Sequence, residues 1–285
     1  MSQEKYMFIR QLLPLLIEER VGIRVTGMST GFKSLDELTS GLHTGLAIVA
    51  SRPCMGKTAM AIDMASHIAI NRSRKVSYFT YNESMTRIVS RFLFQRAGIP
   101  FWTIGEAIKE EDRDNIESAK QSLDEAAIRI FTGSALNLKE ICGEVRAFHG
   151  RDGQGLVVID DIQSLVKANM RTHDPSTKEF SSTLAKLEKL AEEAGVTILL
   201  LSCLPSSVEK RAGARPIFKD MEKSGLLRLH ANLVIFLYRE GLYDPYIRDP
   251  DGVECIVGKN SNGSVGTVLL GFDPNAGRFL DRSEE

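Results

Sequence analysis

The chain has 285 residues, of which 43% are hydrophobic, enough to bury the core of one large α/β domain. Its formal net charge of -1 excludes a globally basic protein, so any contact with nucleic acid must come from a local basic patch or loop. Four cysteines lie far apart with no CxxC or Cys/His cluster, which argues against a zinc site or a disulfide framework and for a reducing compartment.

The first twenty residues hold an apolar cluster that is too broad for an ordinary exposed helix face. Its run LLPLLI at 12–17 is short, contains Pro14 and leads into charged residues, so it indicates neither a signal peptide nor a membrane span. The cluster needs a partner surface, either on its own domain or on an adjacent subunit. We expect a short appendage over 1–20, one domain over 21–285, and a cytoplasmic protein with no membrane contact.

Short apolar runs then recur along the chain, with helical or mixed segments between them. Runs without polar alternation are typical of strands buried on both faces of a mostly parallel sheet, and their alternation with amphipathic segments is typical of a doubly wound α/β fold. We predict strands at 46–50, 76–80, 128–131, 156–159, 196–201 and 233–238.

Two further elements are predicted from the middle and the end of the chain. Residues 183–194 have helical spacing, with Gly195 placed to end the helix. The runs at 253–257 and 264–272 are joined by the turn-rich GKNSNG, which predicts an antiparallel hairpin added to the edge of the sheet.

The strand predicted at 46–50 is followed by SRPCMGKT and then by a helical segment. Phosphate binding needs backbone N–H groups around an anion at a helix N-terminus, a lysine for the β/γ oxygens and a hydroxyl for Mg²⁺. The usual first glycine of such a loop is replaced here, so the prediction rests on strand, GKT and helix in the right order, against a chance GKT in a loop. We predict an ATP and Mg²⁺ site at Ser51, Arg52, Pro53, Cys54, Met55, Gly56, Lys57 and Thr58.

The strand predicted at 156–159 ends in Asp160 and Asp161. A carboxylate at the tip of a buried parallel strand is where such ATPases hold Mg²⁺, so Asp160 and Thr58 are the predicted metal residues. The alternative is a solvated carboxylate at a strand end.

Several blocks of sequence together resemble the C-terminal motor domain of the DnaB-type replicative helicases. The resemblance covers about residues 20–280 and implies a RecA-like P-loop NTPase fold, in a hexameric ring that encircles single-stranded DNA and hydrolyses ATP between subunits. It also makes residues 1–20 similar to the linker helix that packs on a neighbouring motor domain. The blocks are TGMSTGFKSLDELTSGL, ASRPCMGKT, LVVIDDIQSL, SSVEKRAGARPIFKDMEKSG, LVIFLYREGLYDP and GKNSNGSVGTVLL.

The resemblance assigns roles to single residues. Lys57 and Thr58 match the phosphate and Mg²⁺ residues, Asp160 matches the Mg²⁺ aspartate, and Gln163 matches the glutamine that senses the nucleotide. Arg52 and Pro53 match the family's variant of the loop.

The residue that polarises the attacking water departs from the family pattern. Gapless alignment of YFTYNESMTRIVSRFL puts Asn82 at the family's glutamate, with Glu83 one place later. An amide does not accept a proton as a carboxylate does, so hydrolysis loses a general-base factor of roughly 10² to 10⁴ unless the strand end presents Glu83 as the catalytic residue.

Three other positions also depart from the family. Ser261 stands at the arginine finger of the hairpin tip, leaving Lys259 as a partial substitute without the guanidinium fork. Cys203 replaces a glutamine, and RLHAN at 228–232 replaces an acidic stretch. The alternative is a working motor whose catalytic groups come from shifted positions such as Glu83, Lys259 or Arg278.

Candidate DNA contacts come from cations after LVVIDD. Lys167, Arg171 and Lys178 match the place of the family's central-channel loops, which track the phosphate backbone, and a solvated loop is the alternative.

Two functions follow from these residues and from the resemblance. The first is an ATP-binding DnaB-like motor that acts on single-stranded DNA as a homo-oligomeric ring in replication. The second is a catalytically degenerate paralogue that keeps nucleotide and regulates, loads or inhibits a true replicative helicase as its hetero-partner. A RecA relative of the strand-exchange or clock type is the least favoured alternative.

Overall fold

The computed structural model describes residues 27–103, 109–133, 136–150, 154–169, 177–211, 213–221, 223–244 and 246–282. Within them the strands form one nine-stranded sheet in the order β3-β2-β4-β5-β1-β6-β7-β8-β9. The six strands from β3 to β6 are parallel, and β7, β8 and β9 continue the sheet antiparallel. The strands are β1 Gly45–Ser51, β2 Val76–Thr80, β3 Ile128–Thr132, β4 Leu156–Asp160, β5 Thr197–Cys203, β6 Ala231–Tyr238, β7 Gly252–Asn260, β8 Gly266–Asp273 and β9 Arg278–Asp281.

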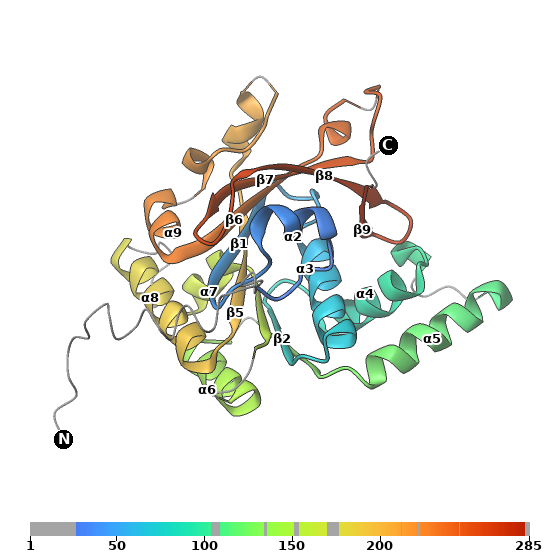
Figure 1. The fold of residues 1–285 in the computed structure, drawn as a ribbon, viewed down its shortest axis with the longest axis horizontal. Coiled ribbons are helices and arrows are strands. Elements are labelled where there is room, and N and C mark those ends of the chain that lie inside the picture. Colours follow the sequence, from blue (N-terminus) through green and yellow to red (C-terminus); the bar gives the residue numbers. More distant parts are fainter. Residues whose placement is uncertain are drawn as a thin grey trace, which may run out of the picture.

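Helices cover both faces of this sheet (Figure 1). In that view α2, α3 and α4 lie on one side of the strands, and α6, α7 and α8 lie on the other. The α-helices are α2 Lys33–Thr39, α3 Lys57–Ser66, α4 Met85–Ala97, α5 Arg113–Asp124, α6 Leu138–His149, α7 Ile162–Ala168, α8 Thr177–Ala194 and α9 Ser224–His230, and a π-helical turn, His67–Asn71, extends α3.

Strand β1 shows why a strand without polar alternation is buried on both of its faces. Ala47 and Val49 belong to the apolar cluster under α3, and Leu46 and Ile48 belong to the cluster under α8. Because successive side chains point to opposite faces, a strand covered on both sides must be apolar at every position.

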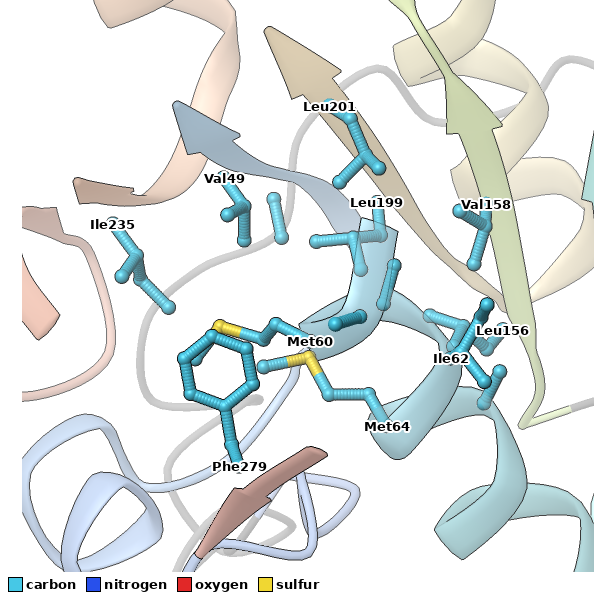
Figure 2. Close-up of a cluster of buried hydrophobic side chains, with 14 of the residues drawn as sticks. Val49, Met60, Ile62, Met64, Leu156, Val158, Leu199, Leu201, Ile235 and Phe279 are labelled. Carbon is cyan, nitrogen blue, oxygen red and sulfur yellow. The ribbon is translucent and has the colours of Figure 1, made fainter. Parts of the chain in front are cut away.

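Helix α3 follows the predicted phosphate loop, which is the segment from Ser51 to Gly56, and the apolar face of α3 anchors it on the sheet. Met60 and Met64 of α3 lie against Val49 and Leu199 of the central strands, as Figure 2 shows. All four side chains are buried, and each contributes about 1.5–3 kcal/mol through removal from water. The N-terminus of α3 is thereby held at the carboxyl edge of β1.

The predicted doubly wound, mostly parallel sheet with a C-terminal antiparallel hairpin is confirmed. Three elements differ from the sequence prediction. Strand β3 was expected to be buried on both faces, but it is an edge strand whose residues are half-buried or, at Arg129, exposed. The helix predicted from residue 183 begins six residues earlier, at Thr177, where Phe180 is the only large apolar side chain to signal it. Strand β9 was missed, because four residues are too few to show a period. No helix among the described residues is both long enough and apolar enough to span a bilayer.

Candidate nucleotide-binding site

The chain leaves β1 at Ser51 and turns through a tight loop into α3, which begins at Lys57. Gly56 has φ of 101°, and a Cβ there would lie 2.7 Å from the Phe279 ring of β9. Only glycine satisfies both constraints. Cys54 also has a positive φ, 66°.

Arg52 fixes the start of the loop. Its guanidinium donates to the Glu209 carboxylate at 2.8 Å and to the Leu204 carbonyl at 2.7 Å. The loop is therefore tied to the segment that follows β5.

Lys57 is only 8% exposed, and its ammonium faces the inside of this loop. Its Nζ donates to the Ser51 carbonyl at 3.1 Å, to Ser51 Oγ at 3.2 Å and to the Arg52 carbonyl at 3.2 Å. A buried cation at a helix N-terminus is a ready anion-binding arrangement, so these residues fit a bound phosphate chain.

Thr58 and Asp160 meet beside the loop. Thr58 Oγ1 donates to Asp160 Oδ2 at 2.9 Å, and Tyr78 OH of β2 donates to the same oxygen at 3.2 Å. Burial raises the pKa of Asp160, and the hydrogen bond from Thr58 acts against that shift. A hydroxyl beside a carboxylate is the oxygen donor set that fits Mg²⁺, which also keeps waters and phosphate oxygens. In the described part of the chain no three His, Cys, Asp or Glu side chains gather for a metal.

The end of β2 carries Asn82 and Glu83, the two candidates for the water-polarising position. Asn82 Nδ2 donates to Asp161 Oδ2 at 3.1 Å, so the asparagine faces the end of β4. Both oxygens of Glu83 accept from the Arg91 guanidinium of α4, at 2.9 and 3.0 Å, and Arg87 adds a further ion pair at 3.4 Å. The predicted catalytic Glu83 is therefore held by α4, whereas Asn82 contacts the residue next to Asp160.

Gln163 links the end of β4 to the end of β5. Its Nε2 donates to Ser202 Oγ at 3.0 Å and to the Cys203 carbonyl at 3.1 Å. Burial raises the pKa of the Cys203 thiol, while the nearby Lys57 ammonium acts to lower it. The predicted sensor glutamine thus contacts a residue that lies within electrostatic reach of the loop lysine.

Lys259 lies in β7, two strands away from β1, and its ammonium contacts the segment before β6 and not the phosphate loop of its own chain. It pairs with Val234 in β6, and the following Ser261 donates its N–H to the Asn232 carbonyl at 2.8 Å, next to the start of β1. The Lys259 ammonium donates to the Arg228 carbonyl at 2.6 Å, and burial, followed by the Arg228 charge, lowers its pKa. The structure thus does not bring Lys259 to this chain's own loop.

The predicted DNA residues are placed differently from the expectation of a loop. Lys167 is exposed on α7, and Lys178 is exposed in the first turn of α8, so neither lies in a loop. The reason is that Asp161 caps α7 at once after β4, its carboxylate accepting from Ser164 N at 2.7 Å. Arg171, like residues 1–20, lies outside the described residues.

Two members of the site were not singled out from the sequence. Tyr78 lies inside an apolar strand, where nothing marks its hydroxyl as a partner of Asp160. Asp161 was visible as the second carboxylate of the pair, but only the fold shows that it turns toward Asn82.

Comparison with known proteins gives consistent matches. The family model described as the DnaB-like helicase C terminal domain matches residues 27–281. The replicative DNA helicase DnaC of Bacillus subtilis is 32% identical over 259 residues, which are 90% of this chain and 57% of that helicase. The chain therefore spans little more than half the length of such relatives.

Two solved structures share the fold along nearly the whole chain. One, described as an ATPase domain, superposes with a TM-score of 0.89 at 27% identity, covering 98% of this chain and 100% of that one. A DnaB-like replicative helicase, described with its interactions with primase, superposes with a TM-score of 0.88 at 27% identity, covering 99% of this chain and 69% of that one.

Proposed function

The chain belongs to the family of DnaB-like helicase C-terminal domains, and from that premise we propose that it binds ATP with Mg²⁺ and serves as a replicative helicase motor on single-stranded DNA. The observation that carries the proposal is the contact of Thr58 Oγ1 with Asp160 at 2.9 Å beside the buried Lys57 ammonium. Lys57 holds the β/γ-phosphate oxygens, and the loop N–H groups orient the phosphate chain. Bound Mg²⁺, held by Thr58 and Asp160, supplies charge neutralisation on those oxygens.

Oligomeric assembly belongs to the same proposal. Lys259 and Ser261 contact the segment around the start of β6 and not the loop of their own chain, and we propose that they serve a neighbouring subunit's nucleotide. Residues 1–20 are proposed to pack on a neighbour as a linker-like helix, with 21–285 as the ATPase domain. We propose that three cations contact the DNA backbone: Lys167, Arg171 and Lys178. Because the net charge of the chain is -1, the attraction to DNA phosphates must come from such local cations.

A second candidate is a paralogue that keeps nucleotide without turning it over and regulates a true replicative helicase. Specific observations favour it: Glu83 is held by Arg91, and the finger position is Ser261. Loss of a finger in trans costs on the order of 10³ to 10⁵ in rate.

The deciding experiment measures ATP hydrolysis with and without single-stranded DNA, together with direct nucleotide binding. Lys57→Ala is the test variant, and Lys120→Ala, on an exposed lysine of α5, is the matched control. We expect DNA-stimulated turnover that Lys57→Ala abolishes and Lys120→Ala leaves unchanged. Tight binding with turnover no faster than that of Lys57→Ala supports the regulatory paralogue, and absence of nucleotide binding by the wild type contradicts both functions.

A further inference from the structure

Three carboxylates lie at the carboxyl edge of β2 and β4, and their hydrogen bonds assign them different roles. Asp160 Oδ2 accepts from Thr58 and Tyr78, so it belongs to the loop and metal side of the site. Both oxygens of Glu83 accept from the Arg91 fork, and Arg87 adds a second cation. Both oxygens of Glu83 are thus held by cationic donors, which direct the carboxylate toward α4 and neutralise its charge.

Asp161 differs from the other two in its partners. Its Oδ1 accepts from Ser164 N at 2.7 Å, and its Oδ2 accepts from Asn82 Nδ2 at 3.1 Å, so each oxygen has one neutral donor. It takes part in no ion pair with any other residue that the structure describes. An ionised carboxylate offers about four lone-pair sites, so two bonds leave room for a water.

The pair lies beside the residues that bind the phosphate chain. Asp161 follows Asp160 directly, and Tyr81 N, next to Asn82, donates to the Asp160 carbonyl at 3.0 Å. Burial raises the pKa of the Cys203 thiol at the end of β5, and the charges of Lys57, Asp161 and Asp160 also act on it. Asn82, which follows β2, contacts Asp161 on the β2 side of these charged residues.

We propose that Asn82 and Asp161 form a working carboxamide–carboxylate pair that orients the water attacking the γ-phosphate, an inference that rests on the proposed ATP hydrolysis. Asparagine is then a functional part of the site and not damage to it. Phosphoryl transfer passes through a loose transition state, so a group that aims the water contributes even without removing its proton.

The step balances without another reagent. The water oxygen forms a bond to the γ-phosphorus, and the bond from that phosphorus to the β–γ bridging oxygen breaks, leaving its electron pair on ADP. The proton released from the water passes to a γ-phosphate oxygen, giving inorganic phosphate. Asp161 Oδ2 is aimed by Asn82, and its free lone pair accepts a hydrogen bond from the water.

The sharpest test replaces Asn82 by glutamate in the full chain. If Asn82 is an inactivating replacement of a catalytic glutamate, Asn82→Glu restores the missing carboxylate and raises kcat. If Asn82 works with Asp161, the change places two carboxylates against each other, which disfavours both charges, and kcat falls. We expect a fall of at least about tenfold, and a rise of that size overturns the proposal.

Further variants distinguish a role of the Asn82–Asp161 pair from a role of Glu83 and from a loss of folding. Asp161→Asn keeps an oxygen for Ser164 N, and Asp161→Ser is a second variant that also caps α7. Each should lower kcat by roughly 10² with fluorescent ADP binding within about threefold of wild type, while Glu83→Gln retains most of the turnover. Turnover that survives in both Asp161 variants but not in Glu83→Gln overturns the assignment.

A double-mutant cycle on kcat tests whether the two residues act as one unit. We expect the combination of Asn82→Ala and Asp161→Ser to cost little more than the larger single change, whereas independent residues would add their effects. Additive losses contradict a pair. A wild type that binds ADP but never turns ATP over also overturns this inference, and it leaves the nucleotide-binding half of the proposed function standing.

Discussion

Asp63 is a half-buried carboxyl on α3, whose N-terminus forms part of the phosphate loop. Burial raises its pKa to about 7 from an ordinary value of 3.8, although its Oδ2 accepts the Phe279 N–H at 2.8 Å. The native protein therefore keeps a proton on Asp63 over a pH range in which the unfolded chain has lost it. Its contribution to stability is fully present below the unfolded pKa and is lost as pH rises through the folded one.

Asp63→Asn should remove this pH dependence, because an amide also accepts from Phe279 N and does not ionise. The stability gained over wild type is expected to grow by about 1.4 kcal/mol per pH unit between about pH 4 and 7, and to level off above. Denaturant unfolding of both proteins across this range measures it. Asp124→Asn, on an exposed carboxylate, should keep the wild-type profile, and a parallel profile for Asp63→Asn contradicts the prediction.

At the scale of elements, strand β9 connects helix α2 to the phosphate loop. Asp281 of β9 accepts from Ser34 N at 3.2 Å and from Ser34 Oγ at 2.6 Å, which ties β9 to the start of α2. Phe279 is 4% exposed and packs edge-on against Phe32 and Phe272, with ring centroids 6.3 and 5.1 Å away. Strand β9 is thus part of the support of the loop.

Phe279→Ala should lower the free energy of unfolding by about 3–5 kcal/mol, since it opens a cavity against Gly56 and α3. Nucleotide affinity should fall with it, because the loop loses the ring it rests on. Leu280→Ala is the matched control: that side chain is 43% exposed, and the cost should stay within about 0.5 kcal/mol. Equal stability of the two variants would show that β9 does not support the loop.

At the scale of the whole molecule, the predicted phosphate loop and the hairpin of Lys259 and Ser261 lie at different places on one sheet, and we propose that they are halves of a site shared between subunits. The phosphate loop follows the end of β1. Lys259 lies level with Ile48 at the middle of that strand, roughly 10 Å from Ser51 along a strand that rises about 3.3 Å per residue, and Ser261 lies nearer the start of the strand. A site complete in one chain would need both halves at the same edge. The arrangement suits a heterologous, head-to-tail interface that closes into a ring.

Mixing two inactive variants tests this division of labour. Lys57→Ala and Lys259→Ala are each expected to lower turnover strongly when alone. A mixed assembly contains interfaces in which an intact loop meets an intact Lys259, so ATP turnover should recover partly on mixing, as assayed over a range of ratios. If turnover at every mixing ratio is only the weighted mean of the two variants' low rates, Lys259 does not act in the neighbour's site.

Local chemistry made much of the fold and part of the site predictable. Six strands could be placed from their apolar runs, although β3 lies at the edge of the sheet and is only partly buried, and the loop could be placed because GKT follows one of these strands. The roles of Glu83 and Asn82 could not be settled in this way, because their spacing differs by one residue and each partner, Arg91 or Asp161, is decided by packing.

The sequence by itself determined the doubly wound sheet, its antiparallel extension and the loop of Lys57 and Thr58, all of which depend on periodicity and short-range order. Only the tertiary structure decided that Asp161 faces Asn82, that Phe279 supports Gly56 and that Lys259 contacts Arg228 and not its own loop. The physical reason is that these contacts join residues far apart in the chain. Their meeting depends on strand order and register, which no local pattern of residues encodes.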